Sequence, residues 1–147
     1  MDEATQAFCM MVENRSKENR KAMDCFGSPH DVLSPAFSVL RQELDSMIRV
    51  IFLRQLTDFN ERKRLIESTM KGERWQLPTN NGKLRYVTDK DMVDIAQRLH
   101  GWTKSVYKFG CAFVHLSDFH NHLAENPFQK LPNQEKREIL THMRQYH

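Results

Sequence analysis

The sequence predicts an all-α protein, a bundle of about five to six helices with one long loop or small hairpin inserted. Apolar residues recur every three or four positions in several segments, and only 5 Gly and 5 Pro interrupt the 147 residues. Residues 72–87 differ from this pattern, because they combine a Pro with a turn signal. We expect a loop there with at most two short strands. The length suits a single domain over residues 1–147, which can bury a core without disulfide or metal support.

The first half of the chain predicts three helices. Helix-forming residues favour the first from Asp2 to about Phe26, before Gly27. Ser34 is expected to cap the second, from Pro35 to about Thr57, where large apolar residues repeat at helical spacing. The third, expected from Glu61 to about Lys71 with Asn60 as its cap, is highly charged, so we expect it at the periphery.

The second half predicts three more helices after the loop or hairpin, whose turn is expected at Asn80–Gly82. Thr88 and Asp91 have the spacing of a capping box at the start of a fourth helix that ends near Gly101. A fifth helix is expected from Trp102 or Thr103 to about His122. The last is expected over Gln134–Tyr146.

Composition limits the classes of function. A net charge of +3 and a pI near 8.8 permit an RNA partner without indicating one. The 3 cysteines form no CxxC motif and suit free thiols in a reducing cytoplasm. No basic and apolar leader follows Met1, and no segment has the length of a membrane span. We therefore expect a soluble cytoplasmic protein with no membrane partner.

A polar row on the predicted fifth helix contains the most reactive side chains. Its members, spaced by three or four, are Lys104, Lys108, Cys111, His115, Asp118 and His122. Cys111 and His115 could share a metal, but a histidine at position 120 would point about 140° away from His115 on a helix. We expect no metal and no other cofactor, and no GxSxG elbow supports covalent catalysis.

The second helix carries a ladder of charges beside its apolar face. Arg41, Asp45 and Arg49 are each four residues apart, so one carboxylate lies between two guanidinium groups. Two interpretations stay open: a solvated surface ladder, or one wall of a polar site. The loop adds a mixture of basic and aromatic residues that fits either a platform for single-stranded nucleic acid or a loop pinned to the domain: Arg74, Trp75, Lys83, Arg85 and Tyr86.

A histidine near cations is what metal-independent RNA cleavage requires. A general base takes the proton of the ribose 2′-OH, and a cation stabilises the charge that develops on the phosphorane. His115 is the candidate base, with Lys108, Arg41 or Arg49 as phosphate partners and Asp45 between the arginines. The competing interpretation is that this polar row simply meets water.

Two segments together resemble the HEPN superfamily: PAFSVLRQELDSMIRVIFL, residues 35–53, and YKFGCAFVHLSDF, residues 107–119. The resemblance implies an all-α bundle that commonly dimerises. Active members cleave RNA without metal, using an Arg followed by a His after four to six residues. In this chain Lys108 stands where that Arg would precede His115, which keeps the charge but loses the bidentate fork.

A literal match to this Arg-His spacing occurs at Arg137 and His142, but such matches are frequent by chance. We keep this pair as a second candidate site. The function expected is a HEPN-like protein that binds or cleaves RNA, as a metal-independent endoribonuclease and homodimer. The alternative is a non-catalytic helical module for protein–protein interaction or regulation, with a regulatory protein as partner. A small-molecule or metal-binding bundle is a third hypothesis.

Overall fold

A computed structural model describes residues 2–27, 33–115, 117 and 126–146 of the chain. These residues form six α-helices, a small antiparallel hairpin and a 3-10 helix, which confirms the predicted all-α bundle. The elements are α1 (Glu3–Cys25), α2 (Leu33–Gln55), α3 (Phe59–Met70), β1 (Gln76–Pro78), β2 (Leu84–Tyr86), α4 (Asp89–His100), α5 (Thr103–Val114), η2 (Pro127–Lys130) and α6 (Asn133–Tyr146).

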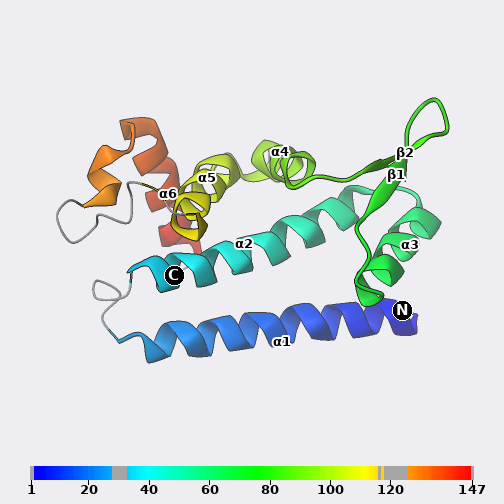
Figure 1. Ribbon diagram of the computed structural model, residues 1–147, viewed down its shortest axis with the longest axis horizontal. Helices are drawn as coiled ribbons and strands as arrows, with labels where there is room; N and C mark the ends of the chain where they lie inside the picture. The colour runs from blue at the N-terminus through cyan, green and yellow to red at the C-terminus, as the bar shows by residue number, and fades with distance from the viewer. Residues whose placement is uncertain (1, 28–32, 116, 118–125, 147) are drawn as a thin grey trace.

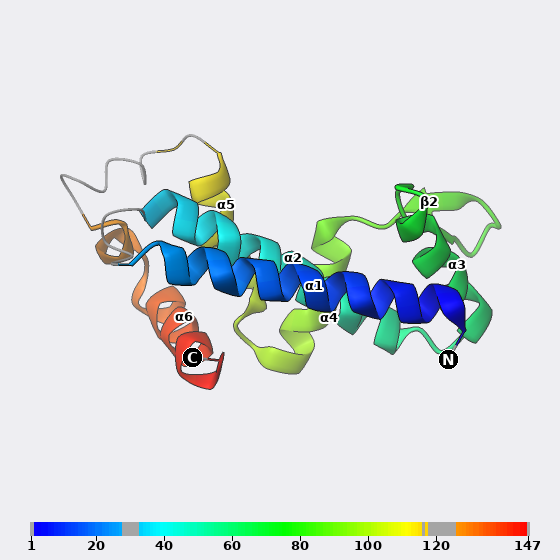
Figure 2. The ribbon, with the colours of Figure 1, turned by 90° about the horizontal axis from the view of Figure 1, so that it is seen from below.

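The long helix α2 lies at the centre of the arrangement (Figure 1). Helix α1 runs antiparallel along one side of it, and α4 and α5 pack on the other side. Helix α6 packs on α5, while α3 packs against α1 near its N-terminal end (Figure 2). The hairpin lies at the α3 end of the molecule, far from α6. In the described ranges, no helix has the length and apolar character needed to cross a membrane.

The core consists of two clusters. The larger cluster contains side chains from all four helices α1, α2, α3 and α4. Its centre includes the fully buried Ile48 and Leu65. Leu65 and its neighbour Ile66 come from α3, so this charged helix contributes to the core although it lies at one end of the molecule.

The smaller cluster joins the C-terminal helices to the start of α2. Phe109 and Phe113 of α5 pack with Leu131 and with Ile139 of α6. Phe37 of α2 completes this cluster, with its ring stacked on that of Phe113 at 4.5 Å.

Helix ends follow the predicted signals in part. The capping box of α4 is confirmed, since Asp91 N–H donates to Thr88 Oγ1 and the Asp91 carboxylate accepts from Thr88 N–H. Gly101 ends α4 with φ of 76°, a left-handed conformation that glycine adopts without strain. Helix α3 is capped by Asp58 rather than Asn60, and α2 already includes Ser34.

Helix α5 is shorter than predicted. It ends at Val114 because His115 has extended backbone angles, φ −102° and ψ 140°. The Ser117 hydroxyl donates to the carbonyl of Ala112 at 2.7 Å and thereby satisfies a group that a longer helix would bond internally. The predicted extension to His122 falls mainly on residues 116 and 118–125, outside the described part.

Candidate functional site

The charges of α2 form part of an ion-pair network that reaches α1. Asp45 Oδ2 accepts a hydrogen bond from Arg49 Nε at 3.1 Å and lies 3.4 Å from Arg15 Nη1 of α1. Arg41 Nη1 lies 4.0 Å from the other oxygen, Asp45 Oδ1. Three guanidinium groups therefore surround one carboxylate whose side chain is only 18% exposed. Asp45 holds α1 and α2 together, so the ladder is not simply a solvated surface feature.

A second carboxylate, Asp89 at the start of α4, continues the network. Its oxygens lie 3.5 Å from Arg41 Nη2 and 3.8 Å from Arg49 Nη2. The Tyr107 hydroxyl of α5 donates to Asp89 Oδ2 at 2.7 Å. Burial and this hydrogen bond to a carboxylate raise the pKa of Tyr107, which keeps the phenol protonated as the donor.

Arg41 is the most enclosed of the three arginines, with a side chain 12% exposed. Its guanidinium carbon lies 3.8 Å from the centre of the Tyr107 ring, and its methylene groups cross α5 at Gly110. Burial opposes the charge of Arg41, but contacts with Cys111, Tyr107 and Asp45 outweigh it and raise the pKa of the guanidinium. The sequence predicts Arg41 as a site residue, but not its partners Asp89 on α4 and Tyr107 on α5.

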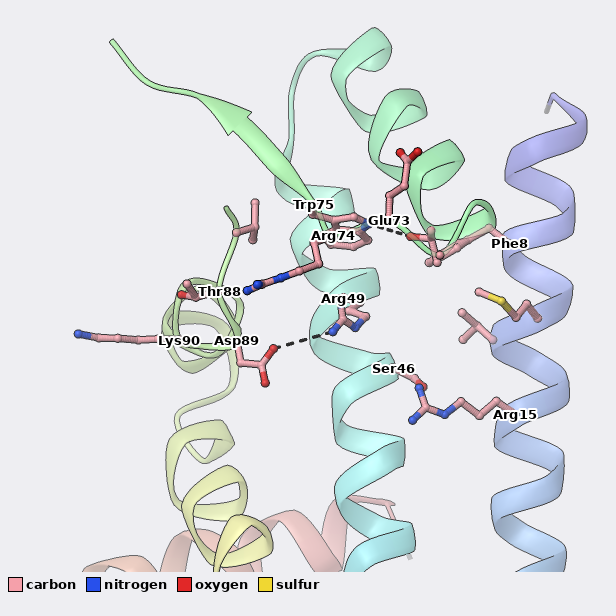
Figure 3. A pocket seen from close by; sticks show the side chains of 15 residues that line it. Phe8, Arg15, Ser46, Arg49, Glu73, Arg74, Trp75, Thr88, Asp89 and Lys90 are labelled. Atoms are coloured by element: carbon pink, nitrogen blue, oxygen red, sulfur yellow. Dashed lines mark hydrogen bonds and ion pairs between the residues drawn. The ribbon is translucent and has the colours of Figure 1, made fainter. Parts of the chain in front are cut away.

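Next to this network lies a cavity of about 690 Å³. Its walls come from α1, α2, the end of α3 with the chain that follows, and the residues around the start of α4 (Figure 3). Four basic side chains line it, Arg15, Arg49, Arg74 and Lys90, against two acidic ones, Glu73 and Asp89. The remaining lining includes an apolar part to which Phe8, Val12, Trp75 and Val87 contribute.

The basic side chains reach the cavity from different directions. Figure 3 shows Arg74 extending from the chain after α3 toward Thr88, while Arg15 extends from α1 toward Ser46 on α2. Arg49 lies between them and is tied to Asp89 across the cavity. A ligand with a phosphate and an apolar or aromatic part would match this lining, because guanidinium groups bind phosphate oxygens through paired N–H donors.

The basic and aromatic residues of the loop have separate roles. Trp75 is buried, with its indole N–H donating to Thr69 Oγ1 at 2.7 Å, so it fastens the loop and offers no free face. Tyr86 is 50% exposed, and the Arg74 guanidinium carbon lies 4.5 Å from its ring centre. Arg85 is paired with Asp91 at 2.9 Å. Of the two predicted alternatives, the pinned loop describes Trp75, and the platform stays a prediction for Tyr86 and Arg74.

The predicted general base, His115, makes no hydrogen bond or ion pair with the predicted phosphate partner Lys108. Lys108 Nζ lies 2.8 Å from Glu135 Oε1 on α6. His115 is exposed just beyond the end of α5, and its side chain makes no hydrogen bond or ion pair with another described residue. Arg41 contacts α5 one turn earlier, around Tyr107 and Cys111. Arg41, Asp45 and Arg49 thus come together, but neither Lys108 nor His115 belongs to their network.

The second candidate pair lies on α6. Arg137 is exposed, and its Nη2 donates to Gln134 Oε1 at 3.0 Å. His142 is helical, but its side chain lies outside the described part of the chain. Within the described part, no three His, Cys, Asp or Glu side chains converge as metal ligands. Asp118, His120 and His122 of the fifth segment lie outside it.

Comparisons with protein families, with curated proteins and with solved structures give no match to this chain.

Proposed function

We propose that this protein binds RNA through the cavity between α1, α2 and the start of α4. One observation carries the proposal: four basic side chains line a single cavity beside an apolar wall. Phosphate contacts supply most of the affinity of nucleic-acid binding, and exposed aromatic rings, such as that of Tyr86 beside Arg74, receive bases. The resemblance of residues 35–53 and 107–119 to the HEPN superfamily supports the same class of ligand.

Two parts of the cavity would have different tasks. Arg49 and Arg15 are held by carboxylates at fixed positions, so they are preorganised for a phosphate at little entropic cost. Arg74 has no carboxylate partner among the described residues and packs on the exposed ring of Tyr86. An RNA base would stack against Tyr86 or the guanidinium plane of Arg74, as bases do on aromatic and arginine faces.

Cleavage is the part of the proposal that needs a second subunit. His115 is exposed and lies apart from the network of Arg41, Asp45 and Arg49. An exposed histidine at a helix end is accessible to another copy of the chain, and the HEPN resemblance implies sites assembled across a dimer. We therefore propose RNA binding for the single chain and assign any metal-independent cleavage to a homodimer.

The test is RNA binding by an Arg74→Ala variant. Arg74 makes no ion pair among the described residues, so its loss should leave the fold intact while removing the guanidinium plane on which an RNA base would stack. We expect the dissociation constant for a fluorescent single-stranded octaribonucleotide to rise about fivefold to tenfold. Arg20→Ala is the matched control, because Arg20 is exposed on α1 and does not line the cavity.

Equal affinities for wild type, Arg74→Ala and Arg20→Ala would contradict binding in this cavity. A loss of the same size in both variants would show a general effect of net charge and would contradict it as well.

A further inference from the structure

A second cavity, of about 500 Å³, lies among α4, α5 and α6. Three lysines line it: Lys90, Lys104 and Lys108. Two of them have carboxylate partners in the same lining, since Lys104 Nζ lies 2.8 Å from Asp94 and Lys108 Nζ lies 2.8 Å from Glu135. Their side chains remain 61% and 71% exposed, so both ammonium groups are accessible to a further anion.

Lys90 lines both cavities. Figure 3 shows its side chain extending away from Arg49 and Arg15, outward from the start of α4. Its ammonium makes no hydrogen bond or ion pair with another described residue. The hydrogen bond from Lys104 is the main cause of the lowered pKa of Asp94, and the charge of Lys90 adds to it. Lys90, which forms no ion pair with another described residue, is thus a basic side chain common to the linings of both cavities.

The two cavities also share a wall. Asp89 lines the first, Tyr107 lines the second, and the Tyr107 hydroxyl donates a hydrogen bond to the Asp89 carboxylate at 2.7 Å. Lys90, which lines both cavities, lies where a ligand long enough to occupy both would pass.

We propose that the two cavities bind different phosphates of one single-stranded RNA, which passes from the first to the second over Lys90. The inference rests on the proposed RNA binding in the first cavity and adds the length and path of the ligand. Arginines would hold the strand in the first cavity through paired N–H donors, and lysines would attract it in the second as point charges. The strand would compete with Asp94 and Glu135 for Lys104 and Lys108.

The experiment compares two lengths of RNA on one double variant. Fluorescence anisotropy is measured with a diribonucleotide and an octaribonucleotide on wild type and on Lys104→Ala/Lys108→Ala. We expect the double variant to bind the octanucleotide about tenfold more weakly and the dinucleotide as wild type does. The slope of log affinity against log salt should decrease in magnitude by about 1.4 for the longer RNA, because two phosphate contacts on a single strand are lost.

The chain offers a matched control. Lys17 and Lys21 are also four residues apart on a helix, are exposed, and line neither cavity. Lys17→Ala/Lys21→Ala changes the net charge equally and should leave both affinities unchanged. Glu135→Gln provides the opposite change: it releases Lys108 from its partner and should strengthen octanucleotide binding about twofold to threefold.

The outcomes separate the two proposals. If the double lysine variant binds the octanucleotide like wild type while Arg74→Ala still weakens it, the path over Lys90 is wrong and RNA binding in the first cavity stands. If neither variant affects either RNA, both proposals fail. If polyglutamate displaces the octanucleotide at equal charge concentration, the surface selects polyanions in general, and the RNA path is overturned.

Discussion

The guanidinium carbon of Arg41 lies over the ring of Tyr107, 3.8 Å from the ring centre. Arg41 belongs to α2 and Tyr107 to α5, and both side chains contact the carboxylate of Asp89 on α4. One arginine therefore fixes the positions of three helices. The same contact holds Asp89 beside Arg49 and so shapes the wall of the first cavity.

Arg41→Ala should destabilise the fold by about 2 to 3 kcal/mol. The change removes the contact with Tyr107. It also takes one cationic partner from Asp89 and one from Asp45, whose side chain is only 18% exposed. Urea denaturation followed by circular dichroism measures the difference. Arg41→Lys keeps the charge but not the planar stack, and should recover only part of the loss. Full recovery by lysine would contradict a role for the stacking geometry.

Gly110→Ala should destabilise the protein by about 1 kcal/mol, although alanine is the better helix former. A Cβ at this position would lie 3.1 Å from Arg41 Cδ and 3.2 Å from Arg41 Cβ. Because the arginine Cβ is fixed by the backbone of α2, the helices would have to separate. The substitution should cost less in an Arg41→Ala background, where the Cδ contact is absent. An equal cost in both backgrounds, by urea denaturation, would show that the Cδ of Arg41 does not cause the crowding.

Stability should depend on the ionisation of Asp91 in the acid range. Its hydrogen bonds from Arg85 and Thr88 lower its pKa from 3.8 to about 2. A lowered pKa in the folded state stabilises the protein above pH 3.8, and this contribution disappears as the pH falls toward about 2. We expect Asp91→Asn to cost about 1 kcal/mol at neutral pH, the size of a lost helix cap.

Urea denaturation at a series of pH values measures this dependence. The difference between wild type and Asp91→Asn should shrink as the pH falls. Asp24→Asn, at an exposed position near the end of α1, serves as the control and should change little at any pH. A constant difference at every pH would mean that the charge of Asp91 is unimportant to the cap.

His115→Ala should leave RNA affinity unchanged, because His115 lines neither cavity. In EDTA, we expect a monomeric wild-type preparation not to cleave a mixed RNA substrate. Cleavage that appears only at concentrations where dimers form, and that His115→Ala abolishes, would agree with a site shared between subunits. Cleavage by the monomer that depends on His115 would contradict the separation of His115 from the cations. Equal cleavage by both proteins would indicate a contaminating nuclease.

Local signals were sufficient to predict much of the fold. Thr88, Asp91 and Gly101 define α4 because capping and left-handed glycine depend on neighbouring residues. The charges of α2 could be placed on one face for the same reason, since Arg41 and Asp45 are one turn apart. At the end of α5, by contrast, the Ser117 hydroxyl donates to the carbonyl of Ala112, five residues earlier, and no periodic pattern in the sequence predicts this bond.

The network itself could not be predicted, because its members lie far apart in the sequence. Arg15 reaches Asp45 across 30 positions, and Arg41 reaches Asp89 across 48. No periodicity connects such residues, and Tyr107 resembles an ordinary aromatic residue on an amphipathic helix. The cavity was missed for the same reason, since its basic side chains come from α1, α2, α4 and the chain after α3. Tertiary packing alone brings them together.

The division of the core into two clusters has a consequence for motion. Helix α6 is attached through the smaller cluster, in which Ile139 is its buried contact among the described side chains. Amide hydrogens of α6 should therefore exchange with solvent through a local opening that needs less free energy than global unfolding, while those around Ile48 of α2 exchange only when the whole fold opens. Such an opening would separate Glu135 from Lys108 and widen the second cavity, and it would leave the first cavity unchanged.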